Sequence, residues 1–317
     1  MKYLLVFLTL IALTSSGQSK IDQAKKLFEN KKYDETKKLL LPIDDDDLDY
    51  AAAQYYLGRI AFAQKEYDAA ADYFEEAAEA NDKNADYFNW LGNTYGTIAG
   101  DANPLRQGML APKMKSAWEK AIALDSKNLD ARISLIQYYL QAPGIMGGSV
   151  EKAKEVAAQV LKLKPSEGHR QLGSIYLNEK KTAEAEKEFI LMAKADPAYV
   201  GGLANFYTSQ KQYDKAFQLF EEVILKNPND FLSIYQYGRT SAVSGQRLEK
   251  GEEYLKKYLT TYTPKQNEPS HAGANMRLAQ IYEKKGNKKE AKRLYELAVK
   301  ADNNLKEAKE GLERVSK

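Results

Sequence analysis

Residues 172–197 read LGSIYLNEKKTAEAEKEFILMAKADP, and this stretch contains the pattern from which the fold follows. Its landmarks are a Leu-Gly pair, two aromatic residues, a small residue between them and a closing proline: Leu172, Gly173, Tyr176, Ala185, Phe189 and Pro197. Small residues let two helices approach closely, and aromatic residues fill the space between neighbouring helices. Because proline ends one helix and suits the first turn of the next, the stretch predicts one pair of packed helices.

The same spacing recurs along the chain. Leu57, Leu203 and Leu278 are each followed by Ala thirteen residues later, at Ala70, Ala216 and Ala291. Less regular copies begin at Leu91, Leu135 and Tyr237, and a degenerate first copy spans residues 21–41. Self-similarity of this kind is the sequence signature of a solenoid, in which each unit packs on its neighbours.

The pattern resembles the tetratricopeptide repeat, whose period is about 34 residues. The resemblance covers nearly the whole chain after residue 17 and implies an all-α, right-handed α-solenoid of about seven to eight helix pairs with a C-terminal capping helix. We expect a signal peptide at 1–17 and a solenoid at 18–317, with regular units near 51–84, 166–196, 197–230 and 272–305, units with insertions near 85–128 and 129–165, a divergent unit at 231–271 and a cap at 306–317. Residues 142–149 and Ser244-Gly245 are similar to features of a group of exported bacterial tetratricopeptide proteins without assigned function, which implies no activity.

The first residues have the composition of a secretory leader. Lys2 precedes a short apolar run, residues 3–13, and small residues at Ser15 and Gly17 suit cleavage before Gln18. At about 1.5 Å per residue this run is too short to cross a bilayer as a helix, so the alternative is an uncleaved interfacial anchor. Because no second long apolar run follows, we expect an exported, soluble mature chain, periplasmic or secreted.

Composition restricts the chemistry. The chain contains no cysteine and only two histidines, His169 and His271, which excludes thiol catalysis, disulfides and cysteine-based metal sites. Its 47 Lys and Arg against 44 Asp and Glu give a net charge of +3, so no large basic field attracts nucleic acid. We find no nucleophile motif, and we expect no enzymatic activity, no cofactor and no metal.

Two insertions interrupt the regular spacing, and departures from an array are favoured places for specific function. In the first, near residues 100–112, Asn103 is expected to cap a helix with Pro104 in its first position. We expect a lengthened helix in which Leu105 and Met109 pack inward. The second, residues 142–149, contains three glycines, and Ser149 is expected to cap the helix that follows.

For the second insertion we favour a structural loop, with a partner-contact loop and a phosphate-binding turn as alternatives. Since the insertions are in tandem units, we expect them side by side. The open stretch 260–272 is interpreted as a longer loop between units. Asp44 to Asp47 is interpreted as a solvated turn rather than a calcium loop, and the basic residues between Lys284 and Arg293 as a charged outer face.

The resemblance implies that the first helix of each pair lines a concave groove. Aromatic, amide and guanidinium side chains suit contacts with an extended peptide. The repeat places ten such residues towards that groove: Tyr55, Arg59, Asn89, Asn93, Gln137, Arg170, Asn205, Tyr235, Arg239 and Gln280. A carboxylate clamp is not expected, because the full basic set is missing. We therefore expect an envelope adaptor that binds a protein or peptide partner, with a peptide- or glycan-binding protein as the alternative.

Overall fold

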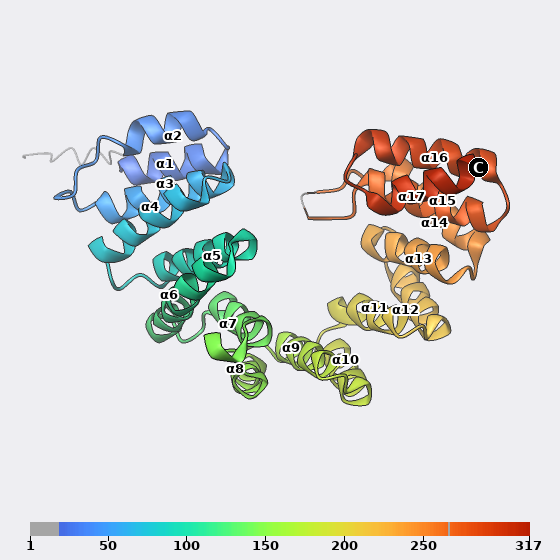
Figure 1. Cartoon of the computed structure of the whole chain (residues 1–317), viewed down its shortest axis with the longest axis horizontal. Coiled ribbons are helices and arrows are strands. Elements are labelled where there is room, and N and C mark those ends of the chain that lie inside the picture. Colours follow the sequence, from blue (N-terminus) through green and yellow to red (C-terminus); the bar gives the residue numbers. More distant parts are fainter. Residues whose placement is uncertain (1–18, 266) are drawn as a thin grey trace, which may run out of the picture. The chain divides into compact units, whose positions relative to one another are not determined.

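The computed structural model of the chain describes residues 19–265 and 267–317, so the leader peptide expected at 1–17 lies outside the described residues. These residues form seventeen α-helices and two short 3-10 helices, and the described part of the chain has no strand (Figure 1). The helices, in chain order, are α1 (Lys20–Glu29), α2 (Tyr33–Leu40), α3 (Tyr50–Ala63), α4 (Tyr67–Ala80), α5 (Ala85–Asp101), α6 (Pro104–Leu124), α7 (Leu129–Gln141), η1 (Gly144–Met146), α8 (Val150–Leu163), α9 (Pro165–Asn178), α10 (Thr182–Ala195), η2 (Pro197–Tyr199), α11 (Val200–Ser209), α12 (Tyr213–Lys226), α13 (Phe231–Ser244), α14 (Leu248–Thr261), α15 (His271–Lys284), α16 (Lys288–Ala301) and α17 (Lys306–Ser316).

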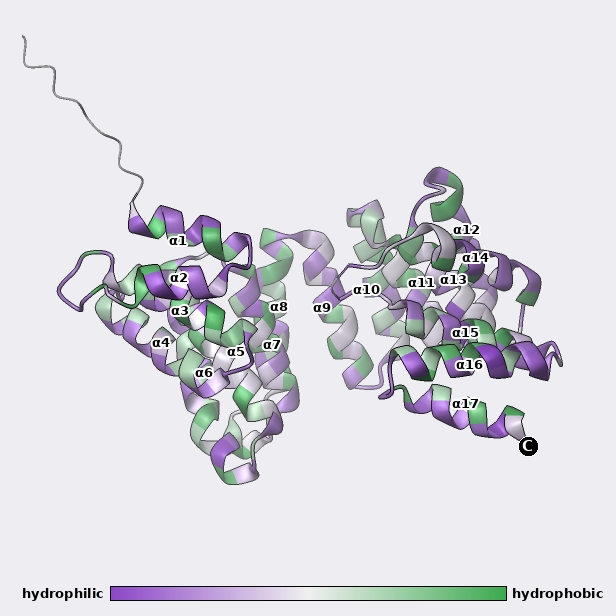
Figure 2. Ribbon diagram, turned by 90° about the horizontal axis from the view of Figure 1, so that it is seen from above, coloured by the Kyte–Doolittle hydropathy of each residue, from purple (hydrophilic) through white to green (hydrophobic). Residues whose placement is uncertain are grey.

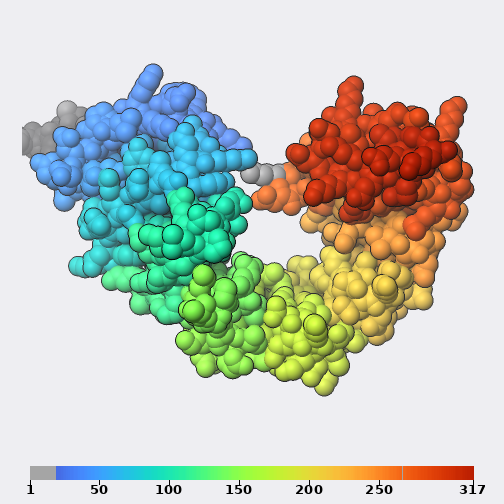
Figure 3. Space-filling view, in the orientation of Figure 1, coloured from blue at the N-terminus to red at the C-terminus, as the bar shows by residue number. Residues whose placement is uncertain are grey.

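The chain divides into two compact units, with the boundary inside α8 after Ala153. The first unit contains the pairs α1/α2, α3/α4 and α5/α6, followed by α7, and the second contains the pairs from α9/α10 to α15/α16. Within each unit successive pairs abut along the colour gradient of Figure 3. The all-α repeat of helix pairs predicted from the sequence is confirmed.

Tight turns join the two helices of a pair. At four of them a lysine adopts a left-handed conformation: Lys31 (φ 58°), Lys65 (65°), Lys180 (61°) and Lys211 (57°). The residue after the lysine donates its backbone N–H to a carbonyl five residues back, as in Lys181 to Tyr176 (2.8 Å). This hydrogen bond closes the helix end and offsets the steric cost of positive φ in a residue other than glycine.

The glycine of the Leu-Gly pair is needed for close helix contact. A Cβ added at Gly58 would lie 2.8 Å from the Phe74 ring, and one added at Gly173 would lie 3.0 Å from the Phe189 ring. Phe74 is fully buried and Phe189 is 8% exposed. The small and aromatic landmarks of the repeat therefore contact each other, as the sequence predicts.

The last helix closes the second unit with one apolar face. Ala308, Gly311 and Val315 of α17 are buried against α16, whereas Lys309 and Glu313 are exposed. Figure 2 shows hydrophilic residues along this helix. A terminal repeat requires such an outer face to stay in water, so α17 is the expected capping helix.

A carboxylate links α14 to α15 in the second unit. Glu252 accepts hydrogen bonds from Lys256 Nζ (2.6 Å), Tyr282 Oη (2.6 Å) and Lys285 Nζ (2.8 Å), and its side chain is 16% exposed. Burial alone would raise the pKa of Glu252, but these three donors outweigh burial and lower it to about 2. The ionised carboxylate therefore stabilises the folded state.

Glu252→Gln is expected to destabilise the second unit at pH 7 by about 1 to 2 kcal/mol, after allowance for partial solvent screening. Because the folded-state pKa lies below the usual value of 4.5, the contribution is present above that value and is lost as the pH falls towards about 2. Urea denaturation followed by circular dichroism at pH 7 and at pH 2.5 measures both effects. The control is Glu253→Gln, since Glu253 is 63% exposed; an equal loss in both variants would contradict the role of Glu252.

Candidate partner-binding site

The two insertions meet in the first unit. Asn103 caps α6 by accepting from the Arg106 backbone N–H (3.0 Å), and Pro104 occupies the first turn, as predicted. Ser149 accepts from the Lys152 N–H (3.3 Å) at the start of α8, also as predicted. A Cβ added at Gly108 of the first insertion would lie 3.7 Å from Met146 Cε of the second, so the expected side-by-side placement is confirmed.

Hydrogen bonds and one ion pair brace both insertions. Gln107 Nε2 donates to the Ala99 carbonyl (3.0 Å), and Arg106 pairs with Asp68 of α4. In the second insertion Tyr138 Oη donates to the Met146 carbonyl. The second insertion ends at Ser149, whose backbone N–H donates to the Tyr139 carbonyl (2.9 Å). The segments therefore have defined positions on α5 and α7.

The expected inward packing of Leu105 and Met109 is wrong: their exposed fractions are 78% and 67%. The buried face of α6 runs through Leu110, Met114 and Trp118. Continued towards the helix start at steps of three and four residues, this face reaches Gln107, which is half-buried, and misses Leu105 and Met109. Ile145 of the second insertion is also exposed, at 95%.

The hollow between the insertions encloses about 570 Å³. We call it the insertion pocket, and α5, α6, α7 and residues 142–146 line it. Met114, Trp118, Tyr138 and Met146 form its apolar part. Trp118 Nε1 (2.9 Å) and Ser134 Oγ (3.0 Å) both donate to Asn93 Oδ1.

The insertion pocket is uncharged. Among the described residues, those that line it include no Asp, Glu, Lys or Arg, although 29% of the chain is charged. Its polar groups are amides and hydroxyls, from Asn93, Thr97, Gln107, Ser134, Gln137 and Gln141. This lining disfavours the phosphate-binding interpretation of the glycine turn, and it brings together two predicted groove residues, Asn93 and Gln137.

Tyr55 and Arg59 lie in another hollow of the first unit, beside α1, which encloses about 470 Å³. Arg59 Nη1 donates to Tyr55 Oη (2.8 Å). Its guanidinium also lies over the rings of Trp90 (4.2 Å) and Phe28 (4.9 Å). The guanidinium is therefore already engaged by its own neighbours, and burial raises the pKa of Tyr55.

Of three further predicted residues, two are buried and the third is held in an ion pair. Asn89 and Tyr235 are only 7% and 8% exposed, and the Tyr235 ring packs 5.4 Å from that of Tyr258. Arg170 Nε donates to both carboxylate oxygens of Glu167, at 2.9 and 3.0 Å. That these three residues bind a partner stays a prediction. A substitution at Tyr235 would disturb the core as well as any partner-binding surface.

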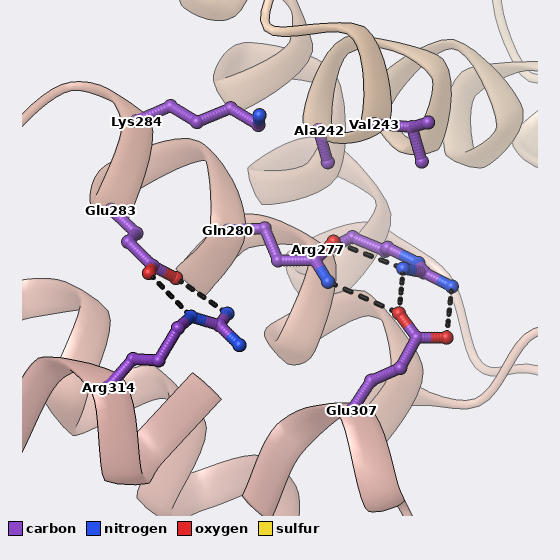
Figure 4. Close-up of a pocket in the computed structure, with 8 residues that line it drawn as sticks. All are labelled: Ala242, Val243, Arg277, Gln280, Glu283, Lys284, Glu307 and Arg314. Carbon is purple, nitrogen blue, oxygen red and sulfur yellow. Dashed lines mark hydrogen bonds and ion pairs between the residues drawn. The ribbon is translucent and has the colours of Figure 1, made fainter. Parts of the chain in front are cut away.

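The last three predicted residues lie in the second unit. Asn205 lines a hollow of about 630 Å³ with Gly201, Gly202 and Gln236. Arg239 Nη1 donates to Gln236 Oε1 (3.2 Å). Gln280 lines a hollow of about 480 Å³ between α13, α15 and α17 (Figure 4).

Four of the five charged groups that line that last hollow pair with each other, and Lys284 is the fifth. Arg277 donates to both oxygens of Glu307 (2.6 and 3.3 Å), and Gln280 Nε2 donates to Glu307 as well (3.3 Å). Arg314 donates to Glu283 through Nε (3.0 Å) and Nη2 (3.1 Å). Figure 4 shows the two clusters side by side, each joining α15 to α17. A ligand would have to replace these contacts, so the insertion pocket is the better candidate.

The two histidines and one arginine of the basic segment contact other residues of the chain. His169 Nδ1 lies 2.7 Å from Glu188, and His271 Nε2 lies 2.7 Å from the Tyr262 carbonyl. In the basic segment, Arg293 pairs with Glu290. Within the ranges that the structure describes, no cluster of three or more His, Asp or Glu is placed to hold a metal, and no helix is long and apolar enough to span a bilayer.

These features define an α-helical repeat protein. Several hollows on its surface are lined by the first helix of a helix pair. Tetratricopeptide repeat models match residues 21–85, 201–226 and 272–310. These three matches support a protein of the tetratricopeptide repeat family. Proteins of this family bind protein or peptide partners and are generally non-catalytic scaffolds.

A solved structure shows the same fold. A tetratricopeptide repeat protein from Parabacteroides merdae is 13% identical, with 94% of this chain and 98% of that chain covered and a TM-score of 0.57. The C-terminal part of a repeat protein from Cytophaga hutchinsonii is 16% identical (92% and 99% covered, TM-score 0.47), and MamA is 19% identical (56% and 90% covered, TM-score 0.46). No curated protein sequence matches the chain.

Proposed function

We propose that this chain is an exported scaffold that binds another protein in the cell envelope. The family supports protein binding in general. The observation that carries the proposal for this chain is the exposure of Leu105, Met109 and Ile145 on two braced insertions beside an uncharged hollow. Exposed apolar side chains on a fixed support are typical of a surface that a partner covers.

Export is supported by the leader sequence at residues 1–17, whose short apolar run and small residues suit cleavage before Gln18. A chain without cysteine suits an oxidising compartment, because no thiol can form an unwanted disulfide there. The mature chain is then periplasmic or secreted.

The proposal is tested by in-cell photo-crosslinking. A photoreactive residue at Gln137, which is exposed on α7, is expected to form one discrete adduct with another protein. The same residue at Gln218, exposed on α12, is the control and is expected to form none. The adduct should occur in the envelope fraction, on a chain that begins at Gln18. Crosslinks of equal yield at both positions would contradict a specific partner, and an adduct confined to the cytoplasm would contradict export.

The dimensions of the insertion pocket favour a second candidate, a soluble periplasmic protein that binds free peptide or glycan. Ligand sites commonly enclose roughly 300 to 1,000 Å³, and this pocket encloses about 570 Å³. This candidate differs from the first in the same experiment, because it predicts no protein adduct at Gln137.

A further inference from the structure

We propose that the insertion pocket is the anchor site for an uncharged, extended segment of the partner, which inserts one apolar side chain between α5 and the two insertions. This inference rests on the proposed function, that the chain binds proteins, and specifies the chemistry of the segment. The regular repeat lacks these insertions, so the site is not a feature of the repeat itself.

The absence of charged residues in the lining favours an uncharged occupant. An Asp, Glu, Lys or Arg in the segment would lose water on entry and would meet no opposite charge among the described lining residues. Burying an unpaired charge is costly, so such a residue is rejected. The lining therefore favours an uncharged segment over one that carries a charge.

Two glycines of α5 leave open space beside the pocket. A Cβ added at Gly100 would meet nothing within 4 Å, and one at Gly96 would lie 3.6 Å from the Trp118 ring, which is an ordinary contact. Neither glycine is needed for packing, unlike Gly92, where a Cβ would lie 2.6 Å from Trp118. Glycine inside a helix costs about 0.5 to 1 kcal/mol relative to alanine. Since both line the pocket, we infer that the space above them is kept for the backbone of the segment.

The polar groups match a peptide backbone. Gln137 and Gln141 lie one turn apart on α7, and neither side chain has a hydrogen bond to another described residue. Each amide offers one donor and one acceptor group, which is what an extended peptide requires. Asn93 is held in place by the two donors on its Oδ1, which leaves its Nδ2 group for the segment.

The aromatic residues favour a peptide over a saccharide. Stacking on a sugar requires an open ring face, but Trp118 and Tyr138 are only 5% and 6% exposed. Their edges, with Met114 and Met146, instead form an adaptable apolar surface that suits an aliphatic or methionine side chain. Met109 and Ile145 are exposed on the two insertions that border this surface.

The test is a selection from a random-peptide display library on the full mature chain, followed by fluorescence anisotropy with the selected peptides. We expect enrichment of peptides that combine an apolar residue with uncharged neighbours. Gly100→Leu fills the pocket from a position with free space and should weaken binding at least tenfold. Gln141→Glu should weaken it similarly. The control Gln218→Leu should leave affinity unchanged, and circular dichroism establishes that all variants are folded.

Several outcomes overturn the inference. Selected peptides rich in acidic or basic residues, or peptides that bind wild type and Gly100→Leu equally, show that the chain binds proteins elsewhere; the proposed function then stands and the pocket assignment fails. If no peptide is enriched, and a neutral oligosaccharide stabilises wild type but not Gly100→Leu against heat, both the inference and the protein-binding proposal fail.

Discussion

Gly168→Ala is expected to destabilise the second unit by more than about 3 kcal/mol, because the added methyl group has no space. A Cβ at this position of α9 would lie 2.2 Å from Leu161 Cα and 2.5 Å from Leu161 N, which are backbone atoms of α8. A backbone cannot move aside as a flexible side chain does, so α9 would have to shift away from α8. The core of the second unit would lose contacts along the whole helix.

The matched control for this substitution is Gly100→Ala, which is expected to raise stability by up to about 1 kcal/mol because alanine is the better helix former. A Cβ at Gly100 meets nothing within 4 Å. Urea denaturation followed by circular dichroism compares the two variants with wild type. Equal midpoints for the two variants would contradict the close contact of α8 and α9.

Phe74→Ala is expected to destabilise the first unit by about 3 to 5 kcal/mol, the usual cost of emptying a large aromatic site in a core. Phe74 of α4 is fully buried, and its ring contacts Gly58 and lies 5.8 Å from that of Trp90. The glycine opposite it has no side chain to fill the cavity.

Tryptophan fluorescence is suited to this measurement, because both tryptophans of the chain, Trp90 and Trp118, lie in the first unit. The control is Leu48→Ala, since Leu48 is fully exposed and its loss should cost less than about 0.5 kcal/mol. The Phe74→Ala transition in urea should move to lower concentration when followed by fluorescence. A midpoint within error of the control would contradict the packing of the first unit.

Much of the fold follows from local sequence. The Leu-Gly pair, the later alanine and the aromatic residues after it predict which faces pack, and Gly58 against Phe74 is one such contact. Gly168 was not predicted, because it lies outside that pattern and its importance depends on how closely α8 approaches α9. The lysines with positive φ were also not predicted, since lysine carries no local signal for that conformation.

The candidate site was less predictable. Projection of the repeat identified Asn93 and Gln137, but it could not show that α14 and α15 cover Tyr235. Trp118, Tyr138 and Met146 belong to three segments whose meeting depends on two insertions of irregular length. One signal was available in the sequence, because residues 142–149 contain no charged residue in a chain that is 29% charged.

The proposed binding mode depends on one property, that a partner protein enters the insertion pocket. In-cell crosslinking from Gln137 in wild type and in Gly100→Leu measures this property in the native compartment. We predict one adduct in wild type and its loss in Gly100→Leu, with equal amounts of folded protein. An undiminished adduct in Gly100→Leu would contradict the account, because the partner would then bind without entering the pocket.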